Sequence, residues 1–103
     1  MLVLAFYVPS AAKEMVKQAI FQAGAGRIGN YEFCSFECPG QGQFRPLAGS
    51  RPYLGQLDQL ETVDEVKVEV VCEEAVITAV IQALKSSHPY ETPAYHVIKT
   101  LNY

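Results

Sequence analysis

Residues 2–8, near the N-terminus, are apolar at every position, and this run constrains the fold more than any other feature of the sequence. The run is short, rich in Val and aromatic residues, and ends at Pro9, which indicates a buried strand rather than a helix. Alternate residues of a strand face opposite sides of its sheet, so both faces of this strand require burial. If helices cover one face, Val3, Ala5 and Tyr7 form an apolar patch on the other. We therefore expect the chain to associate with itself.

The composition is typical of a single globular domain. The 103 residues, 50% of them hydrophobic and 18% charged, suffice for one domain with a core but not for two. Eight basic and eleven acidic residues give a net charge of −3, and the basic residues are scattered along the chain. Because nucleic-acid binding normally requires a clustered basic face, we expect no nucleic-acid partner. No apolar run approaches about 18 residues, so no membrane segment is expected either.

The N-terminal run and the cysteines predict the cellular compartment of the protein. The run has no basic flank and Pro9 interrupts it early, so we do not expect it to be a signal peptide. Cys34, Cys38 and Cys72 are too few, and odd in number, for the paired framework of a small secreted domain. We expect a cytoplasmic protein with reduced thiols.

The first half of the chain predicts a helix followed by a second strand. Ser10 is a candidate N-cap for a helix whose apolar face runs from Ala12 to Ala23, and Gly24 is expected to end it. Alternation predicts the strand at residues 30–38, followed by a turn at residues 39–42.

The second half predicts a long excursion and then a strand, a helix and a strand. Residues 42–62 contain five glycines or prolines, so we expect at most one short strand there, around Phe44. Loops of this length are usually functional or interfacial. Alternation predicts a strand at residues 63–72, and residues 93–101 form the last strand. Glu73 and Glu74 are expected to open the helix, Pro89 to end it, and its buried stripe is Val76, Ile77, Val80, Ile81 and Leu84.

The resulting order is β-α-β-β-α-β. It predicts an α+β, ferredoxin-like sandwich, a single domain over residues 1–103, in which two helices cover one face of an antiparallel sheet. In this topology, residues 40–62 and residues 88–91 lie at the same end of the sheet, and residues 24–31 lie at the opposite end. Only an oligomer could unite all three segments.

Three separated motifs carry a resemblance to a known family. They are GAGRIGNY at residues 24–31 followed by CSF at residues 34–36, GQGQFRP at residues 40–46, and HPYETPAY at residues 88–95. Together they resemble the inserted domain of the NGG-interacting-factor-three-like family, and this chain looks like a stand-alone version. The larger members of that family carry a two-metal site in a flanking domain, so the resemblance implies no hydrolase activity for this chain.

The motif at residues 88–95 is also similar to one in the CutA family of divalent-cation tolerance proteins. Those proteins are ferredoxin-like trimers that resemble PII signalling proteins, and residues 40–62 would be an insertion relative to them. The resemblance implies a CutA-like or PII-like oligomer, a trimer as first expectation and a dimer as second. It does not imply an activity.

Gly24, Gly26 and Gly29 match the dinucleotide-binding fingerprint in spacing. That fingerprint requires a preceding strand and a following helix, whereas these glycines follow a helix and precede a strand. A helix C-cap at Gly24 and a tight turn with positive φ are the favoured interpretation. The alternative is an anion-binding nest of glycine amides beside Arg27, with Tyr31 as a further ligand-binding candidate.

Two of the cysteines, Cys34 and Cys38, fall on one face of the predicted strand at residues 30–38. Their Cα atoms would be roughly 13 Å apart. A disulfide or a shared zinc ion would need a bend near Cys38, so we expect small core thiols instead.

His88, Tyr90 and Glu91 are the strongest candidates for a ligand-binding site. Two prolines shape this corner, but turns seldom demand an imidazole, a phenol and a carboxylate together. His88 and Glu91 are candidate ligands for a divalent metal ion, or an acid and base pair. The alternative is that Tyr90 and Glu91 only satisfy backbone groups at the corner or at a subunit interface. His96 is expected to be a partly buried structural histidine.

The leading functional hypothesis is a non-enzymatic, oligomeric PII-like or CutA-like domain. It would bind a small ligand or metal ion, or regulate a partner protein. The alternatives are a metal-dependent hydrolase that uses His88 and Glu91, and a purely structural interaction scaffold. If a ligand binds, we expect residues 88–91 to take part, together with residues 40–62 or a neighbouring subunit.

Overall fold

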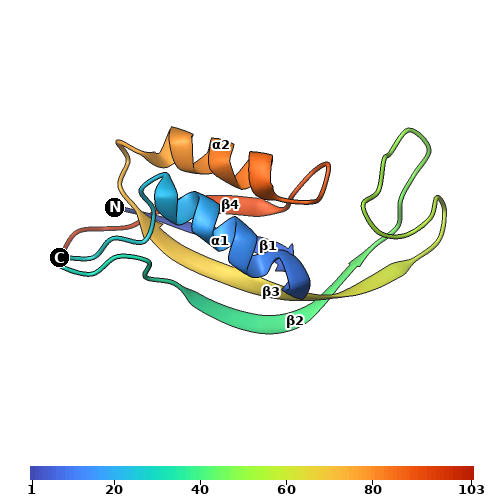
Figure 1. Ribbon diagram of the computed structural model, residues 1–103, viewed down its shortest axis with the longest axis horizontal. Helices are drawn as coiled ribbons and strands as arrows, with labels where there is room; N and C mark the ends of the chain where they lie inside the picture. Colours follow the sequence, from blue (N-terminus) through green and yellow to red (C-terminus); the bar gives the residue numbers. More distant parts are fainter.

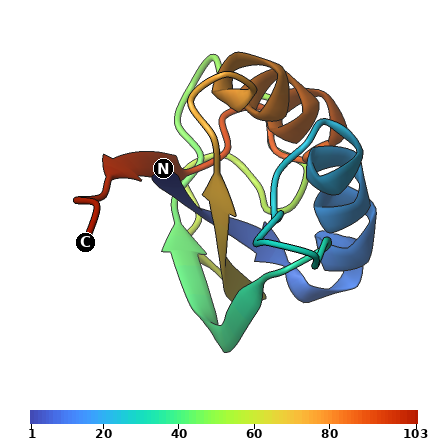
Figure 2. The same ribbon diagram turned by 90° about the vertical axis from the view of Figure 1, so that its left-hand side faces the viewer.

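The computed structural model describes residues 1–103, and its elements follow the predicted order. Four strands form one antiparallel sheet in the order β2-β3-β1-β4, and both α-helices pack on the same face of it (Figures 1 and 2). The predicted ferredoxin-like α+β sandwich is therefore confirmed. The elements are β1 (Leu2–Pro9), η1 (Ser10–Ala12), α1 (Lys13–Gln22), β2 (Phe36–Phe44), β3 (Glu61–Cys72), α2 (Ile77–Ser87) and β4 (Tyr95–Lys99).

The core lies between the sheet and the two helices. Leu4 and Phe6 of β1 are fully buried against the helices, and they pair with Val70 and Val68 of β3. The predicted stripe of α2 is confirmed, because Val80 and Leu84 are fully buried and its other members pack against the core. On α1 the buried residues are Val16, Ile20 and Phe21.

The second strand lies six residues later than predicted. Alternating aromatic residues favoured a strand at residues 30–38, and Pro39 with its glycine neighbours favoured a turn at residues 39–42. Instead β2 runs straight through Pro39, which pairs with Val66. The strand tolerates this proline because it lies at the edge of the sheet, where no neighbour needs the missing amide hydrogen.

Both helix N-termini differ from the predictions. Ser10 makes no side-chain capping hydrogen bond, because it is the first residue of the short 3-10 turn η1 that leads into α1. Glu73 and Glu74 precede α2 instead of opening it, and the helix begins only at Ile77, after a turn. The last strand is also shorter than residues 93–101, with bounds Tyr95–Lys99.

A pair of ion bridges ties the edge strand to the first helix. Glu37 of β2 accepts hydrogen bonds from Lys13 Nζ at 2.6 Å and Lys17 Nζ at 2.9 Å. These bonds lower the pKa of the Glu37 carboxyl below its ordinary value. The two lysines therefore hold β2 against α1, in a strand that has no fully buried side chain.

All three cysteines are free thiols, but only one of them is in the core. Cys72 is buried, and burial raises the pKa of its thiol. Cys34 is half-buried and Cys38 is exposed, so the expectation of core thiols is wrong for these two. Cys34 also lies outside β2, and the predicted common strand face for this pair is therefore absent.

The face of the sheet opposite the helices carries no layer of helices (Figure 2). Val3 and Tyr7 of β1 lie half-buried on it, whereas Ala5 is already buried within one chain. At the edges of this face, Phe36 on β2 and Ile98 on β4 keep 67% and 54% of their surface exposed. We call this surface the open face. No helix of the structure has the length and apolar character needed to cross a membrane.

The molecule is elongated, 46 Å by 24 Å by 24 Å, because β2 and β3 extend past the rest of the sheet. Their projecting ends and the connecting residues 45–60 form an arm that extends beyond the helices in Figure 1. Residues 40–62 thus lie beside the turn between α2 and β4, and residues 24–31 lie at the other end, as the topology predicts.

Candidate functional site

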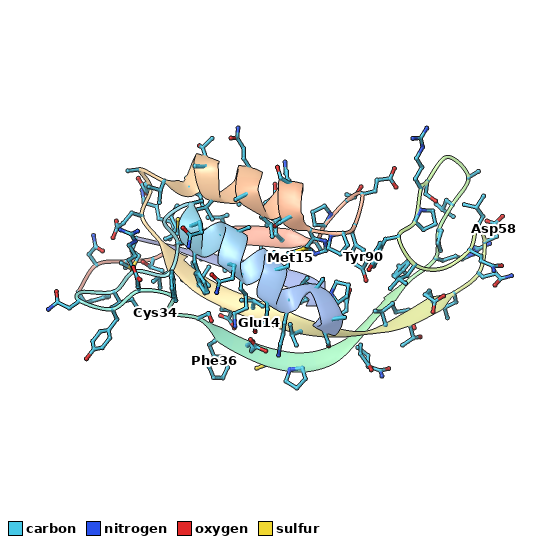
Figure 3. All side chains as sticks on the ribbon, in the orientation of Figure 1. Glu14, Met15, Cys34, Phe36, Asp58 and Tyr90 are labelled. Carbon is cyan, nitrogen blue, oxygen red and sulfur yellow. The ribbon has the colours of Figure 1, made fainter.

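A cleft of about 290 Å³ lies where the arm meets the turn between α2 and β4. Four separate segments of the chain build it: Tyr7 of β1, residues 43–54 at the end of β2 and in the arm, Glu65 of β3, and residues 90–94. In Figure 3, Tyr90 lies between the helices and the arm, whose far end carries Asp58. We call this the corner cleft. It is lined by Tyr7, Gln43, Phe44, Pro46, Ser50, Pro52, Tyr53, Leu54, Glu65, Tyr90, Glu91, Thr92 and Ala94.

His88 supports the cleft from behind and does not line it. The side chain is buried, and its Nε2 donates a hydrogen bond to the carbonyl of Tyr7 at 2.7 Å. Its Nδ1 accepts a hydrogen bond from the amide of Tyr90 at 3.1 Å, which assigns the ring proton to Nε2. Burial lowers the pKa of His88, against smaller opposing effects of the Tyr7 carbonyl and of Glu65. His88 is therefore a neutral link between β1 and the corner.

Tyr90 is the central side chain of the corner cleft. Its hydroxyl donates a hydrogen bond to Oε2 of Glu65 at 2.7 Å. Its ring packs near Phe44 and Tyr53, with ring centroids 5.9 and 6.3 Å away, and behind it His88 lies at 5.0 Å. Burial and the Glu65 carboxylate raise the pKa of Tyr90 strongly, so the phenol keeps its proton. The corner cleft therefore has aromatic walls that are fixed by a charged hydrogen bond.

Glu65 reaches Tyr90 across the face of the neighbouring strand. A Cβ atom added to Gly42 of β2 would overlap the Glu65 carboxylate, so a side chain at this position would force Glu65 to move. The same carboxylate is half-buried on β3, in the wall of the cleft. Gly42 thus makes room for the acid that orients Tyr90.

Glu91 connects the corner to the arm. Its Oε2 accepts a hydrogen bond from the backbone amide of Arg51 at 3.0 Å, although both residues are exposed. Tyr90 and Glu91 therefore contact residues 40–62 as predicted. A role in binding stays a prediction.

The other predicted candidates lie elsewhere. Tyr31, with 75% of its surface exposed, belongs to the tight turn at the opposite end, where its backbone bonds to Ile28, the residue after Arg27. Gly24 and Gly26 have φ angles of +113° and +79°, and their amides donate to the carbonyls of Phe21 and Val71. Since these amides already have partners, they are not free to form an anion-binding nest. The C-cap of α1 is Ala23, one residue before the predicted Gly24, and the predicted positive φ is found at Gly24.

A metal site at the corner finds no support in the geometry. Both ring nitrogens of His88 are engaged by the backbone, so neither is free to bind a metal ion. No group of three or more His, Cys, Asp or Glu side chains lies close enough to hold one. His96 lies exposed on β4, so the expectation of partial burial is wrong for it.

Sequence reasoning missed Glu65, Tyr53 and Tyr7 as parts of the cleft. Glu65 alternates with valines in β3, a pattern that indicates only a solvated strand face. Tyr53 lies in a stretch without periodicity, and Tyr7 was assigned to a patch on the first strand. The only available signal was Gly42, two residues before Phe44, because a glycine inside a strand marks a close approach.

Comparison with known proteins agrees with the motifs. A GTP cyclohydrolase 1 type 2 homolog of Bacillus subtilis is 47% identical over 94 residues, which are 91% of this chain and 25% of the relative. The crystal structure of a Bacillus cereus protein related to NIF3 has a TM-score of 0.83 and 38% identity, covering 98% of this chain and 26% of the other. The chain thus spans about a quarter of these relatives.

The same fold occurs in proteins of similar size. The periplasmic divalent cation tolerance protein CutA of Archaeoglobus fulgidus has a TM-score of 0.70 at 17% identity, over 100% of this chain and 87% of that one. No protein-family model matches the chain. The chain is therefore a relative of the NIF3-related proteins, similar to one segment of their length, and it has the fold of CutA.

Proposed function

We propose that this chain is a non-catalytic, self-associating domain that binds a small molecule in the corner cleft. One observation carries the proposal: segments from β2, the arm and the α2–β4 turn converge on a concave, aromatic-walled cleft. Clefts lined mainly by apolar groups, with a few fixed polar groups, are the usual form of small-molecule sites. The Tyr90–Glu65 hydrogen bond holds such polar groups in place before any ligand arrives.

The absence of catalysis in this proposal rests on how the reactive groups are used. His88 donates to one backbone group and accepts from another, so it has no free position for proton transfer. The raised pKa of Tyr90 keeps its phenol protonated. Ser50 lines the cleft, but its hydroxyl donates to the carbonyl of Leu47 at 2.7 Å and not to a base, so the metal-dependent hydrolase is the weaker alternative.

Self-association is supported by the open face. Val3, Val71 and Ile98 pair across neighbouring strands on this face, and an apolar row of this kind gains free energy from burial against a second copy. A trimer is proposed ahead of a dimer on the likeness in fold to CutA. Light scattering of the Val3→Lys variant tests this, because a lysine without a partner would dissociate the assembly. Met15→Lys, on the exposed surface of α1, is the control and leaves the assembly intact.

Ligand binding is tested with a metabolite library screened by amide chemical shifts in two-dimensional NMR. We expect binders to shift the amide signals around Tyr90, Tyr53 and Phe44. The Tyr90→Leu variant should bind the same compounds more than about tenfold more weakly. Tyr31→Leu removes a tyrosine from the opposite end of the molecule and should leave binding unchanged. A library without one binder at the cleft, or binders that need Tyr31 and not Tyr90, would refute the proposal.

An interaction scaffold is the second candidate function. The observation that favours it is that the chain matches one segment of much longer relatives, and that apolar side chains of the arm are exposed. Leu47, Leu57 and Leu60 keep between half and two-thirds of their surface exposed, which is typical of residues that contact another protein. A Leu57→Lys variant that loses a co-purified partner while still binding small molecules would support this function instead.

A further inference from the structure

We propose that the ligand of the corner cleft is a small organic cation, a protonated amine attached to an apolar body. The proposal rests on the proposed function and adds the charge of the ligand to it. Three features carry it: the aromatic rings of the wall, the two carboxylates among them, and the basic groups that are missing from the lining.

The aromatic wall offers ring faces to a ligand. The rings of Tyr90, Phe44 and Tyr53 approach one another at angles of 62° and 55° and do not stack flat. Such tilted rings around one space resemble the walls that attract ammonium groups through the negative charge of their faces. Tyr90 and Phe44 are half-buried and therefore fixed, whereas Tyr53 is exposed on the arm.

Two carboxylates, those of Glu65 and Glu91, give the wall of the cleft a negative charge. Glu65 uses one oxygen for the hydroxyl of Tyr90, and each carboxylate oxygen has two lone pairs, so it can still accept a hydrogen bond from an ammonium group. Glu91 likewise has one oxygen that accepts from the amide of Arg51. Both side chains line the cleft.

No Lys, Arg or His side chain lines the cleft to neutralise these two acids. The nearest basic residues in sequence have other partners: Arg45 pairs with Asp58 at 3.5 Å, and Lys67 lies 3.9 Å from Glu69. Arg51 contributes its backbone amide to Glu91, while its side chain is exposed. A cation would therefore find an uncompensated negative charge, and an anion would be repelled.

The volume limits the size of the ligand. The cleft volume of about 290 Å³ lies just below the range for small-molecule sites, which begins at about 300 Å³. This volume suits an amine with one ring or a short alkyl chain. The cation would lie between the carboxylates, and its apolar body would lie against Phe44 and Pro46.

The test compares three probes that share one ring and differ in charge. Benzylamine is a cation at pH 7, benzyl alcohol is neutral and benzoate is an anion, and each is titrated into the intact protein while amide shifts are recorded. We expect benzylamine to shift the cleft amides and to bind about tenfold more tightly than benzyl alcohol, with benzoate the weakest. Equal affinities, or benzoate as the tightest probe, would overturn the inference.

Two variants locate the charge. Glu65→Gln keeps an acceptor for the Tyr90 hydroxyl and removes one of the two negative charges, so the affinity for benzylamine should fall by a larger factor than the affinity for benzyl alcohol. Glu74→Gln removes an exposed charge near α2, outside the cleft, and serves as the control. If both variants reduce benzylamine binding equally, the effect is one of net charge and the inference fails. If neutral or anionic metabolites shift the cleft amides and benzylamine binds no more tightly than benzyl alcohol, the inference of a cationic ligand is refuted and the proposed function stands. If no compound binds in the cleft, both are refuted.

Discussion

The two ends of the sheet are built by different means. At the end that holds Gly24 and Gly26, backbone groups satisfy one another: Gly24 and Ala25 donate to α1, and Gly26 donates to β3. At the end that holds the corner cleft, side chains make the connections, because His88 bonds to β1 and Tyr90 bonds to Glu65 of β3. At the first end the glycine amides are already paired with backbone carbonyls, whereas at the second end the carboxylates of Glu65 and Glu91 and the ring of Tyr90 line a cleft.

This difference distinguishes two motifs of similar prominence in the sequence by the chemical groups that each leaves accessible. The glycines are required where the chain needs positive φ and close approach, and these demands account for all of their chemistry. The residues at 88–91 also hold the fold together, yet Tyr90 and Glu91 still face a cleft. If this contrast holds, substitutions at the glycine end change stability through backbone conformation and close approach, and substitutions at the corner change it through lost side-chain contacts.

The largest effect is expected at Gly26. An added Cβ would lie 2.8 Å from the carbonyl oxygen of Cys34 and 2.9 Å from the Phe21 ring, at a φ of +79°. We expect Gly26→Ala to lower the free energy of unfolding by about 3 to 4 kcal/mol, measured by urea denaturation. Gly29→Ala also has positive φ but meets nothing within 4 Å, so it should cost only about 1 kcal/mol. Equal losses in the two variants would contradict the close-approach argument.

The second effect is expected at His88. The His88→Ala variant leaves a cavity and deprives the Tyr7 carbonyl and the Tyr90 amide of their partner. We expect the free energy of unfolding to fall by about 2 to 3 kcal/mol. His96→Ala removes an exposed imidazole from β4 and should change it by less than about 0.5 kcal/mol. Equal losses in the free energy of unfolding for His88→Ala and His96→Ala would contradict the role of His88 as a link between β1 and the corner.

A smaller effect is expected from pH. The pKa of His88 is lower in the folded protein than its ordinary value of 6.5, so the unfolded chain binds the proton more readily. The resulting stability is present above pH 6.5 and is lost as the pH falls through the lowered folded-state pKa. Urea denaturation between pH 7.5 and 5 should show this decline in the parent, and a much flatter profile in His88→Ala. Parallel profiles would show that another group titrates.

The smallest effect is expected at Glu91, whose bond to Arg51 joins two exposed residues. Glu91→Ala should lower the free energy of unfolding by less than about 0.5 kcal/mol. Amide hydrogen exchange at Arg51 should nevertheless become faster, because the amide loses its acceptor. Unchanged exchange at Arg51 would mean that the arm is held by its aromatic contacts alone.

The sequence predicted the order of elements and the position of the corner, because hydrophobic periodicity and chain topology determine both. It misplaced the second strand because Tyr31 and Phe33 imitate strand alternation, while Phe33 has a φ of +61° and stacks on Phe21. It could not assign His88 to a supporting role, because one of its two partners is a carbonyl 81 positions away. Glu65 was missed for the same reason: contacts between distant segments leave no local pattern.

Pro39 has a consequence for how far assembly can proceed. A sheet edge with free amides is a template on which further chains can add strands without limit. Proline is tolerated in a strand where its nitrogen points away from the neighbouring strand, so Pro39 leaves the outer edge of β2 without a donor at its midpoint. The opposite edge is β4, which offers only five residues. Growth of fibres along the strand-pairing direction is thus discouraged at both edges, which leaves the open face as the surface for the closed assembly that we propose.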